Sequence, residues 1–299
     1  MLPAFARVLP AFALAWTACC LLVPSAQAAL QFPAAATLES NGSNIKRGIS
    51  ATTAGDVNGD GYSDVIFSDD GVSTGHGAVY VYLGGPSGNL FDPSRLNFSK
   101  TDFNLGPQVA GIGDVNGDGY DDVAVASSNA VYVYYGGPSG ITAAGVTTKV
   151  ITGYISTFYP IHVAPAGDVN GDGYADLAVG LPANGCTGSN SGAFAIYYGG
   201  PSGVNFAGGS SVCGLAANYY LGISINTAGD VNADGYADVI VGAPGDGPNG
   251  RAYVYLGSAA GLTTAGRVTL TGDEAFCSFG ASVSTAGDIN GDGDRKSVV

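Results

Sequence analysis

The sequence predicts an all-β protein, a β-propeller of four-stranded blades, and three observations lead to this prediction. One Asp-rich motif recurs five times in the 299 residues, first as AGDVNGDGYSDVIF from Ala54 to Phe67. Between its copies lie short runs in which β-branched and aromatic residues recur at every second position, which is typical of strands. No stretch beyond the N-terminal segment shows apolar residues at helical spacing with helix caps. A repeat fold made of strands follows from these observations.

The motif defines a repeat of about sixty residues. Its first aspartates lie between 54 and 62 residues apart, and they are Asp56, Asp114, Asp168, Asp230 and Asp288. A near-constant period of this length suits stacked or radially arranged units. We expect repeats over 45–299, divided at about 45–100, 101–153, 154–216 and 217–273, with the start of a fifth over 274–299.

Each repeat contains candidates for four strands. The segment before the motif supplies one, such as GASVSTAGD from Gly280, and the run after it a second, such as DVAVA from Asp122. A strictly alternating run follows, such as AVYVYYGG from Ala130, and then a weaker one, such as GRVTLTGD from Gly266. Four strands per repeat favour a propeller blade. A β-solenoid is the alternative, although its coils are usually shorter.

The N-terminal segment is expected to lie outside the repeats. Arg7 precedes the apolar run AFALAWTACCLLVP, and Ala26-Gln27-Ala28 offers a small-x-small cleavage site. This order predicts a signal peptide over 1–28, cleaved after Ala28, and a lead-in over 29–44. The run is short for a membrane anchor, which is the alternative. No later segment is apolar enough to span a membrane, so we expect a secreted, extracellular or cell-surface protein.

Cysteines and sequons add two further expectations for an exported chain. Cys19 and Cys20 leave with the signal peptide unless the segment is a lipoprotein signal. Cys186 and Cys213 lie in one repeat and are candidates for a disulfide, which leaves Cys277 free or paired outside this sequence. The sequence also contains two N-x-S glycosylation sequons, at Asn41 and Asn97.

The charge balance points to cations rather than nucleic acid. The chain has 24 acidic and 10 basic residues, a net charge of −14, and all its acids except Glu39 and Glu274 are aspartates. No basic patch is visible that would bind nucleic acid. A strong preference for Asp in Gly-rich loops indicates cation ligation.

The motif itself has the pattern of a calcium loop. Asp56, Asn58 and Asp60 alternate, Gly61 permits a sharp turn, and Asp64 follows. Calcium takes six to eight oxygen ligands, which such a loop supplies with alternate side chains, the Tyr62 carbonyl and a closing carboxylate.

The same roles recur in three further loops, and partly in a fifth, so about four calcium ions are expected. The predicted ligands are Asp56, Asn58, Asp60, Tyr62, Asp64; Asp114, Asn116, Asp118, Tyr120, Asp122; Asp168, Asn170, Asp172, Tyr174, Asp176; Asp230, Asn232, Asp234, Tyr236, Asp238; and Asp288, Asn290, Asp292. In the fifth loop Lys296 replaces the closing acid, which predicts a poor or absent site.

Two other interpretations of the motif fit the sequence less well. An EF-hand, or a dockerin-like helical loop, needs flanking helices and a Glu at the twelfth position, where the first loop has Phe67 inside a predicted strand. A metal-free Asp-Gly turn is the second alternative, and four intact copies argue against it.

The repeat resembles the FG-GAP repeat of integrin α subunits, also present in secreted bacterial proteins, and the resemblance covers nearly all of the chain from about Ile45. The naming signatures are degenerate: FG is intact at Phe279-Gly280 and GAP at Gly242-Ala243-Pro244. The resemblance implies a seven-bladed propeller, of which this chain would be a truncated part. It also implies calcium with a structural role, bound in the blades away from the usual ligand surface.

A catalytic site is not expected. His76 and His162 lack a metal-site partner, and GPSG recurs as a turn rather than as a nucleophile elbow. A glycosidase-like pair among Asp69, Asp70, Asp92 and Asp102 is a minor alternative.

The preferred function is a non-enzymatic, extracellular binding or adhesion module for protein or glycan ligands. The turns SDDGVSTGHG, LPANGCTGSNSG and APGDGPNG differ between repeats, which suits a recognition surface. The alternatives are the non-catalytic propeller of an extracellular hydrolase or lyase whose catalytic region lies elsewhere, and a structural spacer.

Overall fold

The computed structural model describes residues 47–69, 78–86, 91–96, 108–142, 146–151, 158–287 and 296–298. Every described residue belongs to one compact unit, Thr37–Val299. The expected signal peptide and lead-in lie outside the described residues. Over the described ranges the chain forms no helix, and hence none long and apolar enough to cross a membrane.

The described chain forms four antiparallel four-stranded sheets and one two-stranded sheet. The strands of the first two sheets are β1 (Arg47–Gly55), β2 (Asp64–Asp69), β3 (Ala78–Leu83), β4 (Phe91–Leu96), β5 (Gln108–Gly113), β6 (Asp122–Ala126), β7 (Ala130–Tyr134) and β8 (Thr147–Val150). Those of the other three are β9 (His162–Gly167), β10 (Asp176–Leu181), β11 (Ala193–Tyr197), β12 (Ser210–Cys213), β13 (Ile225–Gly229), β14 (Asp238–Ala243), β15 (Arg251–Tyr255), β16 (Val268–Thr271), β17 (Ser284–Gly287) and β18 (Lys296–Val298).

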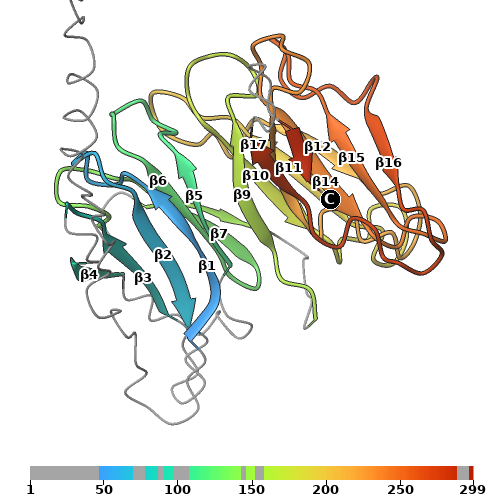
Figure 1. Cartoon of the computed structure of the whole chain (residues 1–299), viewed down its shortest axis with the longest axis horizontal. Helices are drawn as coiled ribbons and strands as arrows, with labels where there is room; N and C mark the ends of the chain where they lie inside the picture. The colour runs from blue at the N-terminus through green and yellow to red at the C-terminus, as the bar shows by residue number, and fades with distance from the viewer. Residues whose placement is uncertain are drawn as a thin grey trace, which may run out of the picture. The chain divides into compact units, whose positions relative to one another are not determined.

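Each four-stranded sheet pairs its strands in chain order, and the first strands of consecutive sheets contact one another. The contacts run from β1 to β5, β9, β13 and β17 (Figure 1). Up-and-down sheets placed side by side through their first strands are propeller blades. The predicted all-β fold with four-stranded blades is therefore confirmed.

The core consists of layers between neighbouring blades. Val123 and Val125 on β6 pack toward the first blade, whereas Ala124 and Ala126 on the same strand pack toward the third. Successive side chains of a strand point to opposite faces, so both faces of the strand are buried. This explains why the second strand of each repeat is a continuous apolar run rather than an alternating one.

Antiparallel pairing places the connections on two edges. The motif loops join first to second strands, and the turns beginning with Gly84, Gly136, Gly199 and Gly257 follow third strands, so both kinds lie at one edge, here called the motif edge. The connections from second to third strands and from one blade to the next lie at the other edge, here called the loop edge.

The loop edge carries a disulfide. Cys186, in the connection between β10 and β11, is bonded to Cys213 at the end of β12, with Cα atoms 5.9 Å apart. The candidate pairing is therefore confirmed, and Cys277 is a free, exposed thiol.

Candidate metal centres

Four of the five motif loops are described, one between the first two strands of each four-stranded blade. Asp288, Asn290 and Asp292 of the fifth loop lie outside the described residues, as do His76, Asp70 and Asp102. His162 lies on β9, where burial lowers its pKa to about 4.

The alternate side chains of each loop turn toward one another. In the first loop, the Asp56 carboxylate accepts the backbone N–H groups of Asp60, at 3.0 Å, and Gly61, at 2.8 Å. The Asn58 amide donates to Asp60 Oδ2 at 3.0 Å. The corresponding contacts recur in the other three loops. The structure thus brings the first three predicted ligand side chains of each described loop together.

The closing aspartate lies deeper, at the first position of the second strand. Asp64 is fully buried, and its two oxygens accept the backbone N–H groups of Val57, at 2.8 Å, and Gly84, at 2.7 Å. The equivalent residues Asp122, Asp176 and Asp238 are fully buried and accept the same pair of bonds. Each closing carboxylate therefore ties its motif loop to the turn after the third strand.

Burial perturbs these carboxyl groups. It raises the pKa of Asp122 and of Asp176 to about 7, although backbone hydrogen bonds lower the pKa in part and the neighbouring loop aspartates raise it further. Burial likewise raises the pKa of Asp64 and Asp238 above the ordinary value. A nearby cation would favour the ionised form of all four groups.

Consecutive loops also bind one another. The backbone N–H of Ala175 donates to the Asp114 carbonyl of the preceding loop at 3.0 Å, and Asp121 and Ala237 make the equivalent bonds. The Tyr174 ring lies over Gly117, where an added Cβ would come 2.6 Å from Cε1. Tyr62 has no described loop before it and is 41% exposed. Side chains of the motif tyrosines therefore couple neighbouring blades, a role that the sequence did not reveal.

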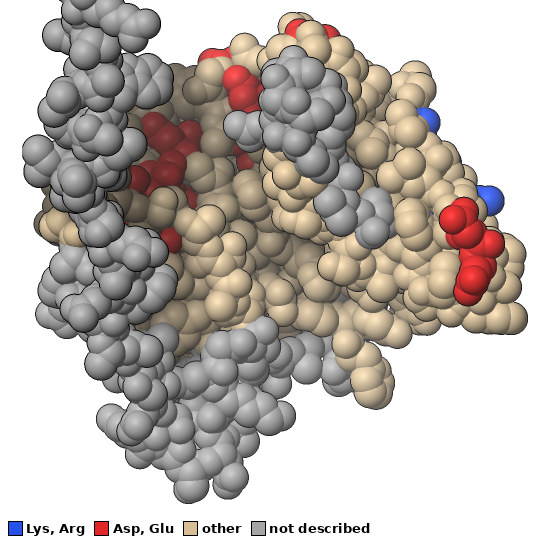
Figure 2. Space-filling view, viewed as in Figure 1, with Lys and Arg blue, Asp and Glu red and all other residues tan. Residues whose placement is uncertain are grey.

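The donor set fits a hard divalent cation. Each loop offers carboxylate, amide and carbonyl oxygens, and a carboxylate oxygen that accepts one N–H keeps a further lone pair for a metal. The described residues form only one ion pair, Arg251–Asp246, so no basic side chain among them neutralises a motif carboxylate. Figure 2 likewise shows acidic side chains gathered in a recess with no basic side chain drawn beside them.

Over the described part of the chain, no group of three or more His, Cys, Asp or Glu side chains is arranged to hold a metal ion. The hydrogen bonds give the reason, because each closing carboxylate faces backbone N–H groups while the other side chains bond within the exposed loop.

The second anchor of the closing aspartate was missed from the sequence. It is the first Gly after each third strand, whose N–H donates to the carboxylate and whose Cα packs on the motif loop. At Gly136 an added Cβ would come 2.5 Å from the Asp121 carbonyl oxygen. The sequence feature that could have revealed this anchor is the recurrence of the Gly at one position of every repeat.

Propeller blades whose first connection is this Asp-rich loop define a class of repeat proteins. The chain contains FG-GAP repeats: residues 114–179 match the FG-GAP-like repeat, and residues 222–255 match the FG-GAP repeat. Over part of its length the chain also resembles integrin α subunits, to which the motif pointed.

Three integrin α subunits illustrate the similarity. Integrin α-6 of Homo sapiens is 37% identical over 136 residues, which are 42% of this chain and 12% of the relative. Integrin α-4 of Xenopus laevis is 32% identical over 143 residues, 44% of this chain and 14% of the relative. Integrin α-PS2 of Drosophila melanogaster is 30% identical over 188 residues, 57% of this chain and 13% of the relative. The chain thus spans a small fraction of the length of these relatives.

Proposed function

We propose that this chain is an extracellular, calcium-binding and non-enzymatic adhesion module that binds a protein or glycan ligand. The observation that carries the proposal is the set of four oxygen-rich loops that share the same hydrogen bonds and have no basic partner among the described residues. Similarity to integrin α subunits supports adhesion as the use of these blades.

Calcium has a structural role in this proposal. In the second loop, Asp114, Asn116, Asp118, the Tyr120 carbonyl and Asp122 would hold it, and the other loops would use equivalent residues. In each of the four described loops, a bound ion would supply positive charge to offset the carboxylates of that loop. Because each loop is hydrogen-bonded to its neighbour, the ion in one loop would also stabilise the next blade.

The loop edge is the proposed ligand-binding surface because its connections around the fourth blade are tied to one another by backbone hydrogen bonds. The connection after β14 bonds to those flanking it, with Gly245 N–H donating to the Tyr219 carbonyl and Phe276 N–H to the Pro248 carbonyl, at 3.3 and 2.8 Å. Leu215 and Phe276 are exposed at this edge, by 65% and 92%. Rigid loops that expose apolar side chains lower the entropic cost of binding.

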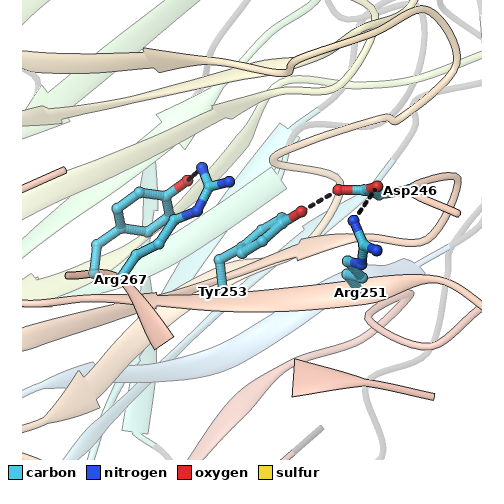
Figure 3. A network of polar contacts seen from close by, with 5 residues as sticks. Asp246, Arg251, Tyr253 and Arg267 are labelled. Carbon is cyan, nitrogen blue, oxygen red and sulfur yellow. Dashed lines mark hydrogen bonds and ion pairs between the residues drawn. The ribbon is translucent and has the colours of Figure 1, made fainter. Parts of the chain in front are cut away.

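A polar network fixes one of these connections (Figure 3). Asp246 is 2% exposed and accepts hydrogen bonds from Arg251 Nη1, at 2.8 Å, and from the Tyr253 hydroxyl. The guanidinium of Arg267 lies 4.4 Å from the centre of the Tyr253 ring. A buried, paired carboxylate of this kind holds the loop to β15.

Backbone conformation gives a second sign that the loop edge is functional. Among the described residues, six that are not glycine have positive φ, and five of these lie at the loop edge: Asn190, Asn218, Tyr220, Phe276 and Ser278. Left-handed conformations cost free energy for such residues and concentrate at functional sites.

Calcium titration calorimetry tests the metal part of the proposal. We expect about four sites per chain, one for each intact motif. Asp118→Ala removes a carboxylate from the second loop and should reduce the stoichiometry by one, whereas Glu274→Ala, at the exposed loop edge, should leave it unchanged. Absence of calcium uptake by the folded chain would refute the proposal.

The adhesion part needs a separate measurement. Immobilised protein should retain extracellular-matrix proteins or cell-surface glycoproteins from a defined panel, and Phe276→Ser with Leu215→Ser should weaken that retention. Equal retention by the wild type and the double variant would exclude the loop edge as the binding surface.

A further inference from the structure

A groove lies at the motif edge between the second and third blades, away from the loop edge. Its volume is about 570 Å3, and its walls are the start of β8 and the turn over residues 199–207. Pockets of roughly 300–1,000 Å3 are typical of sites for small molecules. The principal side chains in its lining are Thr147, Thr148, Ser202, Asn205 and Phe206.

The turn that forms this groove is built on a scaffold that the repeats share. The corresponding segments read GPSGITAAG from Gly137, GPSGVNFAG from Gly200 and SAAGLTTAG from Ser258. In each, the fourth residue is a Gly with positive φ that donates its N–H to the first residue of the segment at 2.7 Å. The shared fold therefore accounts for the backbone conformation of this turn, which needs no role in ligand binding.

The side chains at the groove are not shared. The third repeat has Asn205-Phe206 where the second has Thr142-Ala143 and the fourth has Thr263-Thr264. The first repeat has Leu90-Phe91 there, so a large ring recurs, but the second and fourth repeats fold with small residues and only the third repeat has an amide. This departure marks the turn of the third repeat as a place for recognition.

Both side chains are held in place before any ligand arrives. The Phe206 ring packs edge-on against Tyr197, with centroids 5.0 Å apart, and the Phe206 carbonyl accepts the Lys149 ammonium at 3.1 Å. Asn205 Oδ1 accepts the N–H groups of Ala207 and Gly208, both at 3.1 Å. Fixed side chains reduce the entropy lost on binding.

Several polar groups of the groove keep their hydrogen-bonding capacity. Asn205, Ser202 and Thr148 are exposed, and the Asn205 amide nitrogen and the two hydroxyls donate to no residue that the structure describes. No acidic residue lines the groove, and the nearby Lys149 is bound to the Phe206 carbonyl. The free donors therefore surround an apolar ring in a lining that contains no charged side chain.

We infer that this groove binds a neutral oligosaccharide. A sugar ring has an apolar C–H face, which can pack on Phe206, and a rim of hydroxyls, which can pair with Asn205, Ser202 and Thr148. No charged side chain is among the lining residues, so a charged ligand would gain no ion pair from the lining itself. The inference rests on the proposed function and names a second binding surface, at the motif edge, for its glycan ligand.

Calorimetry and protein-observed NMR with a defined sugar panel test this inference. The panel contains cellotriose, maltotriose and chitotriose as neutral probes, and sialyllactose and a heparin hexasaccharide as charged ones. We expect one or more neutral probes to bind at one site per chain and to perturb signals of Phe206 and Asn205.

The matched variant is Asn205→Thr with Phe206→Thr, which installs the side chains of the fourth repeat on the same backbone. It should lower the affinity about tenfold or more, because an apolar contact and a donor are lost. The control, Thr263→Ala with Thr264→Ala, alters the equivalent turn and should bind as the wild type does.

Two results would overturn the inference: no neutral probe binds, or the Asn205→Thr, Phe206→Thr variant binds the probe as tightly as the wild type. Calcium stoichiometry and retention at the loop edge are measured on the same variant and should not change. If the wild type binds no calcium or shows no retention at the loop edge, the proposed function is wrong. If it shows both but binds no neutral sugar, only the inference about the groove is wrong.

Discussion

The backbone N–H of Gly136 donates a hydrogen bond of 2.8 Å to Oδ1 of the buried Asp122. The other oxygen of the same carboxylate accepts the Val115 N–H at 2.9 Å. One side chain thus joins the start of a motif loop, the first residue of β6 and the end of β7. The same pair recurs in all four described blades, so these buried carboxylates connect the loops and turns of the motif edge to one another.

Gly136→Ala should destabilise the fold by about 1–3 kcal/mol, as overpacking of a tight site does. The new Cβ would lie 2.5 Å from the Asp121 carbonyl oxygen, and relief of that clash would pull the N–H away from Asp122. Urea denaturation in excess calcium measures the effect. Gly137→Ala is the control, because nothing lies within 4 Å of its added Cβ. Equal midpoints for the two variants would contradict the prediction.

Ala233→Gly should stabilise the fold by about 0.5–1 kcal/mol, because Ala233 has a φ of 59° and glycine adopts this conformation at lower cost. The other three described loops have Gly59, Gly117 and Gly171 at this position. Differential scanning calorimetry should show a higher melting temperature. The reverse change, Gly171→Ala, should lower it, since its Cβ would lie 2.6 Å from Tyr236 Cε1. A lower melting temperature for Ala233→Gly would show that no strain is stored there.

Calcium should reverse the pH dependence of stability. In chelator, burial raises the pKa of Asp122 and Asp176 to about 7 in the folded state, so the folded chain binds more protons than the unfolded one between about pH 4 and 7. The free energy of unfolding therefore falls as the pH rises through this range. Calcium needs the ionised carboxylates, so in excess calcium the stability should rise with pH instead.

Urea midpoints across this range, with and without calcium, measure the two slopes. The partly buried His162 contributes in the opposite direction, because desolvation lowers its pKa to about 4 and its unfolded form takes up protons first as the pH falls. In the His162→Gln variant, the pH dependence of the urea midpoint therefore reports the carboxylates without the contribution of the histidine. Slopes of the same sign in chelator and in calcium would argue against calcium at the closing aspartates.

Loss of the disulfide should cost about 3 kcal/mol of unfolding free energy, as expected for a bond that closes a loop of 27 residues. Cys186→Ser with Cys213→Ser frees the β10–β11 connection and leaves the motif edge untouched. Denaturation with and without a reductant gives a second measurement of the same quantity. Cys277→Ser should leave the stability nearly unchanged. A comparable loss of stability in this variant would show that the effect comes from replacing any cysteine and not from breaking the disulfide.

The blades could be predicted because their signals are local. Alternation in AVYVYYGG, the apolar run after each motif and the constant period each depend on residues close together in the chain. The convergence of Asp114, Asn116 and Asp118 was predictable for the same reason, since alternate residues of one tight turn face one centre.

Contacts between distant residues could not be predicted in this way. The bond from Gly199 to Asp176 spans two strands, and that from Ala175 to the Asp114 carbonyl joins two blades. Their partners are set by how sheets pack, which no local pattern records. The groove beside Phe206 is of this kind as well, because one wall belongs to the second blade and the other to the third.

The sequence by itself determined the repeat, the strands and the identity of the oxygen-bearing side chains, because short-range periodicity and turn chemistry encode them. Only the tertiary structure decided that the closing aspartates are buried, that motif tyrosines bind one loop to the next, and that Asn205 and Phe206 face a groove. Burial and proximity depend on which surfaces meet when the blades pack, and that is a property of the whole fold.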